Sequence, residues 1–371
     1  MKAITVDPSL RSITLRDVPE PAARLGQGDV RVRILDVGVC GTDREICCFD
    51  YGEPPPGSDH LVIGHESLGE VVEVGAGVTR VKVGDLVVPT VRRPCPHDTC
   101  TACRAHRQDF CYTGDFVERG IKRAHGYMTE YVVDHEEYMN VVPPALRDVG
   151  VLVEPLTIAE KALAQVWQVQ QRLPWSCPVE PGKKGGNCHR AVVLGAGPVG
   201  LLGAMALATA DFETYVYSRE PRGGAKSRLV ESFGARYVSA SDTAARDLPK
   251  TIGSIDLVYE AAGASGVAFE AMTALGTNGI FVFTGVPGRK GPIPVDTDAL
   301  MRSLVLKNQV VFGTVNAGRD SFEDAVRDLA TFTERWPDTV RSLITSRRAV
   351  DEFRGPLLGQ PEGIKNVLAF S

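Results

Sequence analysis

Four cysteines lie within 17 positions of one another in a stretch with little apolar periodicity. They are Cys95, Cys100, Cys103 and Cys111, separated by four, two and seven residues. Four thiolates at such spacing are typical of a structural zinc site, whose closed tetrahedral shell has no open position for a substrate. Zinc binding would also order a lobe at about residues 92–114 that lacks a core of its own. His97 lies between the first two cysteines and is an alternative to Cys95 as the first ligand.

A second set of metal-binding side chains lies outside this lobe. Cys40 is in the motif Gly-Val-Cys-Gly-Thr-Asp, His65 and Glu66 are in Gly-His-Glu, and Glu154 is in Leu-Val-Glu-Pro. Each motif alone is unremarkable, and the sequence does not show that they meet. Together they offer a thiolate, an imidazole and carboxylates, and three protein ligands with one open position are the usual set for catalytic zinc. Glu66 is either a direct ligand or a group that reaches the metal through water.

Thr42 follows the candidate ligand Cys40 by two residues. A zinc ion lowers the pKa of a bound hydroxyl and so favours an alkoxide near neutral pH. We expect Thr42 to hydrogen-bond the substrate hydroxyl and relay its proton. The alternative is that Thr42 is a turn residue at the start of a helix.

A glycine-rich turn separates an apolar run ending at Leu194 from an apolar helical pattern. In this pattern, the first glycine makes the turn, the second lets the backbone approach a pyrophosphate, and the third lets helix and strand pack closely. The helix N-terminus then faces the phosphates. Further strand-like runs follow at 214–217, 255–260, 280–284 and 310–314, with a weaker one at 236–238, so we predict a Rossmann domain that binds the cofactor at Gly195, Ala196, Gly197, Pro198, Val199 and Gly200.

The end of the second predicted strand bears on the choice of cofactor. NAD-specific folds place a carboxylate about 20 residues past the glycine turn, where it holds the ribose 2′-hydroxyl. Ser218 stands at that point here, and Arg219 after it can pair with a 2′-phosphate. We predict that NADP is accepted and is preferred over NAD or comparable with it. Glu220 is the opposing signal, because it could turn inward and hold a 2′-hydroxyl.

Composition excludes several classes of function. The chain has 371 residues, 43% of them hydrophobic, and a formal charge of -5, which gives no electrostatic case for nucleic acid or an anionic membrane. No apolar run approaches ~18 residues, and the N-terminus has no signal-peptide core. Nine cysteines, four of them clustered, indicate metal binding rather than a disulfide framework. We therefore predict a cytoplasmic protein.

Periodicity divides the chain into three parts. Residues 1 to about 90 are predicted to be rich in strands, and a helix is predicted over 151–171, followed by a linker over 173–186. We predict a catalytic domain at 1–186, a nucleotide-binding domain at 187–316, and a C-terminal segment at 317–371 that returns to the catalytic domain. Other predicted elements are strands at 29–36, 70–74, 79–83, 86–88 and 366–370 and a helix at 322–332.

The motifs resemble, in type and order, those of the zinc-dependent medium-chain alcohol dehydrogenases, and the resemblance covers essentially the whole chain. It is closest to the glucose (aldose) 1-dehydrogenase branch, through runs such as Gly-Asp-Phe-Val-Glu-Arg-Gly at 114–120 and Gly-Thr-Val-Asn at 313–316. The resemblance implies an α/β fold: a GroES-like β-rich catalytic domain and a Rossmann domain with a doubly wound parallel sheet. It also implies oxidation of an aldopyranose, D-glucose or D-galactose, at C1 to the lactone with NAD(P). A homo-oligomer, dimer or tetramer, is expected.

The resemblance assigns roles residue by residue. Two departures matter: the first gap of the cysteine lobe is longer than usual, which puts His97 in the usual register, and Ile158 replaces an acidic sugar contact. Arg92 is a weaker candidate at the rim of the sugar site. The catalytic zinc ligands are expected to be Cys40, His65, Glu66 and Glu154; the sugar contacts Thr42, Glu118, Glu154 and Asn316; and the further cofactor contacts Ser218, Arg219, Thr284, Gly285, Thr314, Asn316 and Lys365.

Two other interpretations stay open. One is a polyol, threonine or other alcohol dehydrogenase on the same scaffold, but Glu118 and Asn316 favour a sugar, since a simple-alcohol pocket would be apolar. The other is a non-catalytic nucleotide-binding protein. Such a protein has no need of Cys40, Thr42 and His65, so their presence argues against it.

Overall fold

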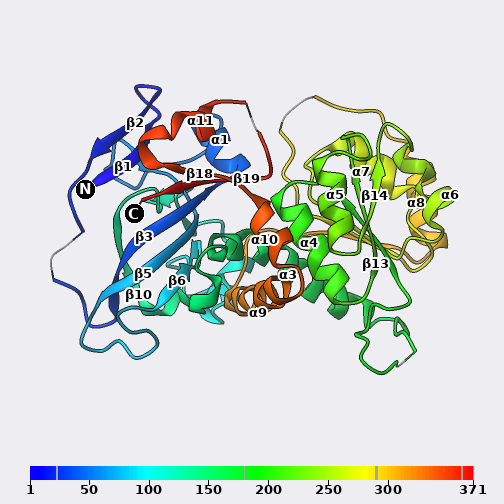
Figure 1. The fold of residues 1–371 in the computed structure, drawn as a ribbon, viewed down its shortest axis with the longest axis horizontal. Coiled ribbons are helices and arrows are strands. Elements are labelled where there is room, and N and C mark those ends of the chain that lie inside the picture. Colours follow the sequence, from blue (N-terminus) through cyan, green and yellow to red (C-terminus); the bar gives the residue numbers. More distant parts are fainter. Residues whose placement is uncertain (22–23, 179, 289–290, 361, 371) are drawn as a thin grey trace. The chain divides into compact units, whose positions relative to one another are not determined.

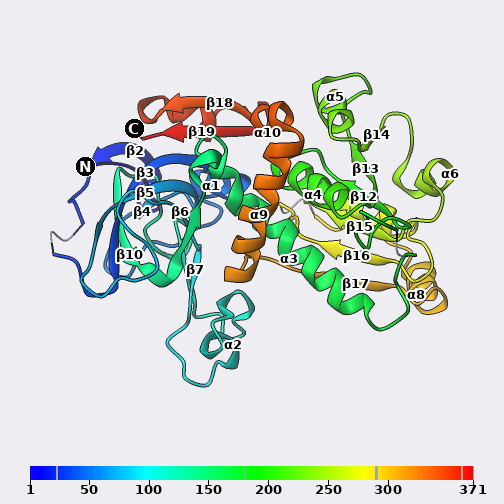
Figure 2. The same ribbon diagram turned by 60° about the horizontal axis from the view of Figure 1, so that its bottom comes forward.

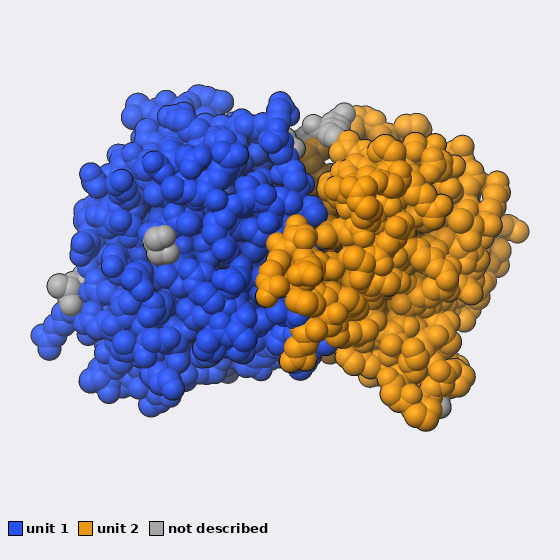
Figure 3. All heavy atoms as spheres, in the orientation of Figure 1, with its two compact units in different colours: residues 1–157, 316–333, 343–371 blue, residues 158–315, 334–342 orange. Residues whose placement is uncertain are grey.

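The computed structural model describes residues 1–21, 24–178, 180–288, 291–360 and 362–370 (Figure 1). The chain forms two compact units, coloured separately in Figure 3. Unit 1 contains residues 1–157, 316–333 and 343–371, and unit 2 contains 158–315 and 334–342. The first boundary lies within the helix α3 (Val153–Gln170), whereas the sequence analysis placed it at residue 186.

Unit 1 is built on a seven-stranded, mostly antiparallel sheet whose central strand is β3 (Asp29–Val39). Alternate apolar residues of β3, including Val30, Val32 and Ile34, are fully buried, as expected of a strand with one face on a core. The C-terminal strand β19 (Lys365–Ala369) pairs with β3, so the end of the chain lies in unit 1. The other strands are β5 (Glu66–Val74), β6 (Leu86–Pro89), β10 (Tyr131–His135), β11 (Met139–Val142) and β18 (Ile344–Ala349).

Unit 1 also contains two three-stranded sheets. One holds β1 (Lys2–Asp7), β2 (Ser12–Asp17) and β4 (Leu61–Val62), and the other holds β7 (Arg92–Arg93), β8 (Val117–Arg119) and β9 (Arg123–Ala124). The predicted strand at 79–83 is wrong. Glu136 accepts hydrogen bonds from the backbone N–H groups of Thr79 and Arg80, which holds this segment in a turn.

The helices of unit 1 are mostly short. The lobe that contains α2 projects from the large sheet, as Figure 2 shows. The amphipathic helix α9 contains the predicted helix 322–332. The helices are α1 (Gly41–Cys47), α2 (Thr101–Arg104), α9 (Arg319–Arg335) and α11 (Arg354–Leu358), with 3-10 turns at Gln108–Phe110, Glu136–Tyr138, Pro144–Leu146, Gly150–Leu152 and Val350–Glu352.

Unit 2 is a parallel six-stranded sheet with the order β14-β13-β12-β15-β16-β17, as predicted for a Rossmann domain. The order reverses between β12 and β15, and ligands of such sheets bind at the carboxyl ends of the strands at that point. The strands are β12 (Arg190–Leu194), β13 (Glu213–Ser218), β14 (Arg236–Ser239), β15 (Leu257–Glu260), β16 (Ile280–Phe283) and β17 (Val310–Gly313).

Helices connect these strands, and α4, α5 and α7 pack on them. Among the described residues, no helix is long and apolar enough to cross a membrane. The unit 2 elements are α4 (Pro198–Thr209), α5 (Ala225–Ser232), α6 (Leu248–Ile252), α7 (Ser265–Met272), α8 (Thr297–Leu306) and most of α10 (Pro337–Leu343), with a 3-10 turn at Ala245–Asp247.

The predicted linker at 173–186 contains a feature that the sequence analysis did not anticipate. Cys177 and Cys188, which flanks the linker, form a disulfide, although the cysteine content indicated metal binding rather than a disulfide framework. Of the nine cysteines, the other seven are free thiols.

Candidate functional site

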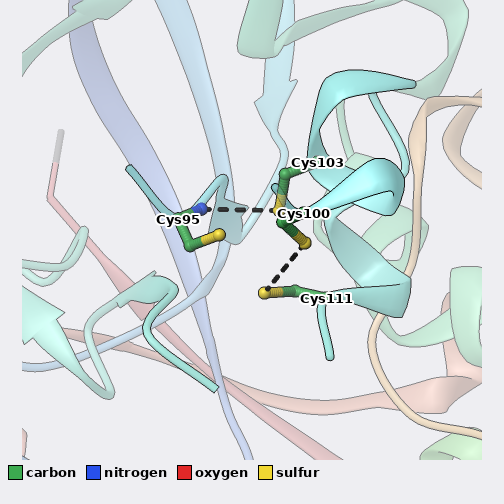
Figure 4. Close-up of side chains that lie close together, drawn as sticks. All are labelled: Cys95, Cys100, Cys103 and Cys111. Atoms are coloured by element: carbon green, nitrogen blue, oxygen red, sulfur yellow. Dashed lines mark hydrogen bonds between the residues drawn. The ribbon is translucent and has the colours of Figure 1, made fainter. Parts of the chain in front are cut away.

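The zinc lobe of unit 1 brings its four cysteines together. The sulfur atoms of Cys95, Cys100, Cys103 and Cys111 lie within 4.8 Å of one another (Figure 4). This set of four soft ligands fits a tetrahedral zinc ion. His97 is not part of the cluster: its imidazole is 47% exposed and lies 2.9 Å from Asp115. The choice between Cys95 and His97 is therefore resolved in favour of Cys95.

Electrostatics in this lobe also favour a cation. Burial raises the pKa of Cys103 to about 12, so its thiolate is costly without an opposite charge. Burial acts in the same direction on Cys111, but hydrogen bonds from Thr113 and neighbouring cysteines outweigh it and lower that pKa to about 6. A dication would stabilise all four thiolates at once.

The second cluster is assembled at the start of α1 and of β5. Cys40 is the N-cap of α1, and its sulfur accepts the backbone N–H of Thr42 at 3.2 Å. His65 and Glu66 come at the start of β5, directly after Gly64, which has a φ of +90°. A Cβ at position 64 would lie 2.5 Å from Met128, so only glycine fits there. Cys40 Sγ lies 3.2 Å from His65 Nε2.

One thiol, one imidazole and one carboxylate thus converge in unit 1. The ligand atoms of Cys40, His65 and Glu66 lie within 4.8 Å of one another, a donor set that suits zinc. Glu154, in the first turn of α3, is buried but is not a member of this close group. Burial raises the pKa of Glu154 to about 7; the charge of His65 lowers it and that of Glu66 raises it, so all three share one electrostatic environment.

Two side chains that the sequence analysis did not connect with the metal support this cluster. The Asp43 carboxylate is fully buried, and its Oδ1 lies 3.5 Å from His65 Nδ1, as in the carboxylate–histidine pairs that orient metal ligands. Burial by itself lowers the pKa of His65, but Cys40 and Asp43 outweigh it and raise that pKa well above its usual range. A negative field of this kind also attracts a metal cation.

Lys365 is the other supporting side chain. It is only 1% exposed, and its ammonium binds the Glu66 carboxylate and the carbonyl of Val39. Burial lowers the pKa of Lys365, whereas the charges of Glu66 and Cys40 raise it above its ordinary value. The contact that the structure gives Lys365 is thus with a candidate zinc ligand, and its predicted contact with the cofactor stays a prediction.

Two of the four predicted sugar contacts, Glu118 and Asn316, form a separate polar group in unit 1. Glu118 on β8 is buried, and its Oε1 accepts hydrogen bonds from Arg92 Nε and Asn316 Nδ2, both at 3.0 Å. Asn316 has a φ of +59°, a left-handed conformation that asparagine tolerates better than most residues. Burial raises the pKa of the Tyr51 hydroxyl, the charge of Glu118 raises it further, and the charge of His65 lowers it.

The glycine turn of unit 2 has the geometry of a phosphate site. Gly195 has a φ of +105°, and a Cβ on Gly200 would lie 2.1 Å from the carbonyl oxygen of Gly195. Gly197 is the N-cap of α4, and a Cβ there would meet no protein atom within 4 Å. The turn, the close packing and the open approach expected of the three glycines are therefore present, with Ala196, Pro198 and Val199 completing the turn.

The end of β13 carries the residues predicted to choose between cofactors. Arg219 is exposed directly after Ser218, the last residue of β13. The Glu220 carboxylate lies 2.6 Å from the ammonium of Lys226, a residue that the sequence analysis did not single out. Because Glu220 is already paired with Lys226, its carboxylate is not available to hold a ribose 2′-hydroxyl.

Glu260 organises the loops at the carboxyl edge of the sheet. This buried residue ends β15, and Oε1 accepts the backbone N–H groups of Ala262 and Gly263, at 2.9 and 2.8 Å. Its Oε2 accepts the N–H of Gly285 at 3.2 Å, and its carbonyl accepts the Thr284 hydroxyl at 2.7 Å. The loops after β15 and β16 are thereby joined through one side chain.

Thr314, another predicted cofactor contact, lies at the end of β17. Its hydroxyl accepts a hydrogen bond from Gln165 on α3 at 2.8 Å. The structure therefore gives this hydroxyl a partner within unit 2, and its contact with the cofactor is untested.

Comparisons with known proteins agree over the whole chain. Residues 26–144 match the family model described as alcohol dehydrogenase GroES-like domain, and residues 147–370 match glucose dehydrogenase C-terminus. The chain is 39% identical to a glucose 1-dehydrogenase of Methanocella arvoryzae over 98% of both chains. It is 38% identical to one of Thermoproteus tenax over 99% of both.

A solved structure is similar over the same extent. It is the Haloferax mediterranei glucose dehydrogenase in complex with NADP, Zn and gluconolactone, at 33% identity and a TM-score of 0.88. The match covers 100% of this chain and 99% of that one.

Proposed function

Because this chain belongs to the glucose dehydrogenase family of zinc-dependent medium-chain alcohol dehydrogenases, we propose that it is an NADP-dependent glucose 1-dehydrogenase. It would oxidise the sugar at C1 and form the lactone, the compound held by the Haloferax relative together with NADP and Zn. The observation that carries the proposal is the convergence of Cys40, His65 and Glu66 in the same unit as the Glu118–Asn316 pair.

The oxidation removes a proton and a hydride from the sugar. Cys40, His65 and Glu66 would hold the zinc ion, which would supply the Lewis acidity that makes the hydroxyl easier to deprotonate. The backbone N–H of Thr42 donates to the Cys40 sulfur, and its hydroxyl is proposed to accept a hydrogen bond from the sugar hydroxyl and relay that proton by passing on its own. Asp43 keeps the His65 ring in one orientation, and Lys365 holds the Glu66 carboxylate by an ion pair. These contacts fix the ligand side chains before substrate arrives. Glu154 is also proposed as a zinc-site residue. We propose that it contacts the C2 hydroxyl of the sugar as well.

The sugar is proposed to bind Glu118, Asn316 and Thr42. Arg92 and Asn316 both bond Oε1 of Glu118, so Oε2 is the oxygen available to a sugar hydroxyl. A site built around buried polar groups discriminates against substrates that leave those groups unpaired. Ile158 supplies no polar contact, so we expect several aldoses, including galactose, to be accepted.

NADP is the proposed cofactor. The phosphates would lie at the turn 195–200, and the 2′-phosphate at Ser218 and Arg219 with Lys365 as a further contact. The other proposed cofactor contacts are Thr284, Gly285, Thr314 and Asn316. Support comes from the open approach above Gly197 and from the Glu220–Lys226 ion pair, which leaves no unpaired carboxylate at the end of β13.

A homo-oligomer, formed in the cytoplasm, is part of the same proposal. β17 is the last strand of its sheet, so one edge of its backbone is free among the described elements. Beside it, α8 buries no residue, and Met301, Val305 and Leu306 are each more than 60% exposed. An apolar surface of this kind next to an open sheet edge suits a second copy of the chain. The molar mass measured by light scattering should correspond to a dimer or tetramer. Val305→Asp should lower this mass to that of the monomer.

The experiment that tests the function is a substrate panel. Purified protein should reduce NADP with glucose and produce gluconolactone, with kcat/KM at least ten times higher than for ethanol, a secondary alcohol, threonine or a polyol. Equal efficiency with a simple alcohol would assign the chain to another activity of the family. Absence of cofactor reduction with any substrate would favour a non-catalytic nucleotide-binding protein.

A further inference from the structure

A disulfide outside both zinc clusters joins two parts of the segment between α3 and β12. Cys177 is partly buried and Cys188 is exposed, and the two residues enclose a short loop. β12 begins two residues after Cys188. The proposed dehydrogenase reaction does not use this disulfide.

The neighbours of Cys188 give its sulfur a polar environment. The imidazole of His189 is buried, and its Nε2 lies 3.9 Å from Cys188 Sγ. Its Nδ1 lies 3.8 Å from Asp256 Oδ1, and its ring stacks on Trp175 with 4.1 Å between centroids. Asp256, His189 and Cys188 thus repeat in unit 2 the order of carboxylate, imidazole and sulfur that Asp43, His65 and Cys40 have in unit 1.

The other sulfur also has a hydrogen-bond donor. The backbone N–H of Cys188 points to Cys177 Sγ at a distance of 3.0 Å. A negative charge that develops on Cys177 would be stabilised by this N–H, and one on Cys188 by the tautomer of His189 that carries its N–H at Nε2. Both sulfur atoms are therefore equipped to leave as thiolates.

We propose that Cys177, Cys188 and His189 form a reversible thiol–disulfide exchange site for a low-molecular-weight thiol. The thiolate of the small molecule attacks the exposed Cys188 sulfur, the bond between the two cysteine sulfurs breaks, and Cys177 leaves as a thiolate and takes up a proton. A second small thiolate attacks the sulfur of the first in the mixed disulfide, and Cys188 leaves as a thiolate. Two small thiols are oxidised to one disulfide, and the two electrons reduce the protein disulfide.

The site controls how firmly its segment is held to the base of unit 2. The Gly186 N–H donates to the carbonyl of Ala210, and the carbonyl of His189 accepts the N–H of Glu213, each at 3.0 Å. These contacts lie at the amino ends of β12 and β13, the edge opposite the glycine turn. Reduction should therefore loosen the base of the sheet and lower the stability of unit 2, while turnover at the carboxyl edge changes little.

The same three side chains have a second possible use. Cys177, Cys188 and His189 offer ligand atoms within 4.8 Å of one another, which suits a soft metal ion when both sulfurs are thiolates. In the disulfide neither sulfur is a thiolate, so disulfide formation and metal binding exclude each other. Metal content therefore distinguishes them.

The first test is alkylation of the native holoenzyme with iodoacetamide, followed by peptide mass spectrometry. Cys177 and Cys188 should be unmodified without reductant, and both should be modified after incubation with millimolar glutathione, while the four cysteines of the zinc lobe stay protected. Immediate modification of Cys177 and Cys188 would overturn the proposal. So would a disulfide that resists glutathione, or uptake of a third zinc ion by the glutathione-treated protein.

The second test is thermal unfolding with and without glutathione. The entropy model for a loop of this length predicts that reduction lowers the unfolding temperature of the wild type by roughly 5–10 °C. The double variant Cys177→Ser, Cys188→Ser should be insensitive to glutathione and keep the wild-type kcat. Cys48→Ser, which removes an exposed free thiol of unit 1, should keep the full response. An equal response in the double variant would show that another group is the target.

Discussion

Arg92 and Glu118 form a buried ion pair in which the Nε and Nη2 atoms of the guanidinium both lie 3.0 Å from one carboxylate oxygen. Arg92 also packs over the ring of Phe116, with 3.7 Å to its centroid, and donates to the carbonyl of Asp109. The guanidinium thus holds Glu118 in one orientation and compensates its charge. We therefore propose that Arg92 acts on the sugar site by positioning Glu118.

Replacement of Glu118 tests the sugar site. Glu118→Ala should raise the KM for glucose by roughly tenfold or more, because a charged hydrogen bond contributes about 1.5–3 kcal/mol. Zinc content and NADP binding should not change. Glu73→Ala, which removes an exposed carboxylate paired with Arg31, is the matched control and should leave the kinetics unaltered. Unchanged sugar kinetics in Glu118→Ala would remove the sugar assignment.

Two zinc ions per chain are expected from the two ligand clusters. Cys100→Ser should lose one ion and lower the unfolding temperature by roughly 10 °C or more, because the lobe is held together by its ligands. His65→Ala should lose the other ion and abolish turnover with the fold retained. Cys48→Ser is the control and should keep both ions. Elemental analysis that finds fewer than two ions in fully active wild type would contradict this prediction.

Acid should destabilise unit 1 through His125. Burial lowers the pKa of this imidazole to about 4, and its Nδ1 accepts the N–H of Val62 at 3.1 Å. The unfolded chain binds a proton near pH 6.5, so stability is present above that pH and is lost as the pH falls toward 4. The side chain is partly exposed, so we expect a loss of about 1 kcal/mol between pH 7 and 5.

Comparison with a variant isolates this contribution. His125→Asn keeps a hydrogen-bond acceptor but no titratable group. Chemical denaturation at pH 7 and pH 5 should show a smaller loss in the variant than in the wild type. An equal loss in both would assign the acid sensitivity to other groups.

Features set by local spacing could be predicted from the sequence. The turn from Gly195 to Gly200 and the four lobe cysteines each lie within one short stretch, so their geometry follows from the chain itself. The prediction of a strand at 79–83 was wrong because the carboxylate of Glu136, far away in sequence, accepts hydrogen bonds from the backbone N–H groups of Thr79 and Arg80. Local apolar alternation carries no information about such a partner.

Contacts between distant segments were not predictable in the same way. Lys365 and Glu66 are 299 residues apart, and they come together because β19 and β5 both pair with β3. Glu260 looks like an ordinary polar residue after an apolar run. Its role depends on three backbone N–H groups contributed by two loops.

The preference for NADP should depend on Arg219. Arg219→Ala should raise the KM for NADP at least tenfold and change that for NAD little, because the proposed partner of the guanidinium is the 2′-phosphate, which NAD lacks. Lys226→Ala should release Glu220 from its ion pair and shift preference toward NAD. Arg228 lies in the same helix as Lys226, α5, so Arg228→Ala is the control for the loss of a positive charge. An equal effect of Arg219→Ala on both cofactors would exclude the proposed contact.

Glu260 should matter for cofactor binding although it need not touch the cofactor. Its two carboxylate oxygens accept three backbone N–H groups from the loops after β15 and β16, and a Cβ on Gly195 would lie 3.1 Å from Ala262 in the first of these loops. Glu260→Gln has nearly the same shape, but its amide nitrogen cannot accept the N–H of Gly285. The N–H of Gly285 would keep its hydrogen bond to the Glu260 carbonyl, at 3.2 Å, but it would lose the side-chain acceptor and face the amide nitrogen, a second donor. A lost hydrogen bond costs about 0.5–1.5 kcal/mol, so the loops should separate.

The expected result is a KM for NADP raised roughly tenfold, with kcat at saturating cofactor within about twofold of the wild type. Glu213→Gln, at the amino edge of the same sheet, is the matched control, because it removes a carboxylate that pairs with Arg190 and Arg236 far from the glycine turn. A merely structural role of Glu260 would lower the unfolding temperature and leave the KM for NADP unchanged. That outcome would show that the two loops keep their cofactor-binding geometry without the carboxylate.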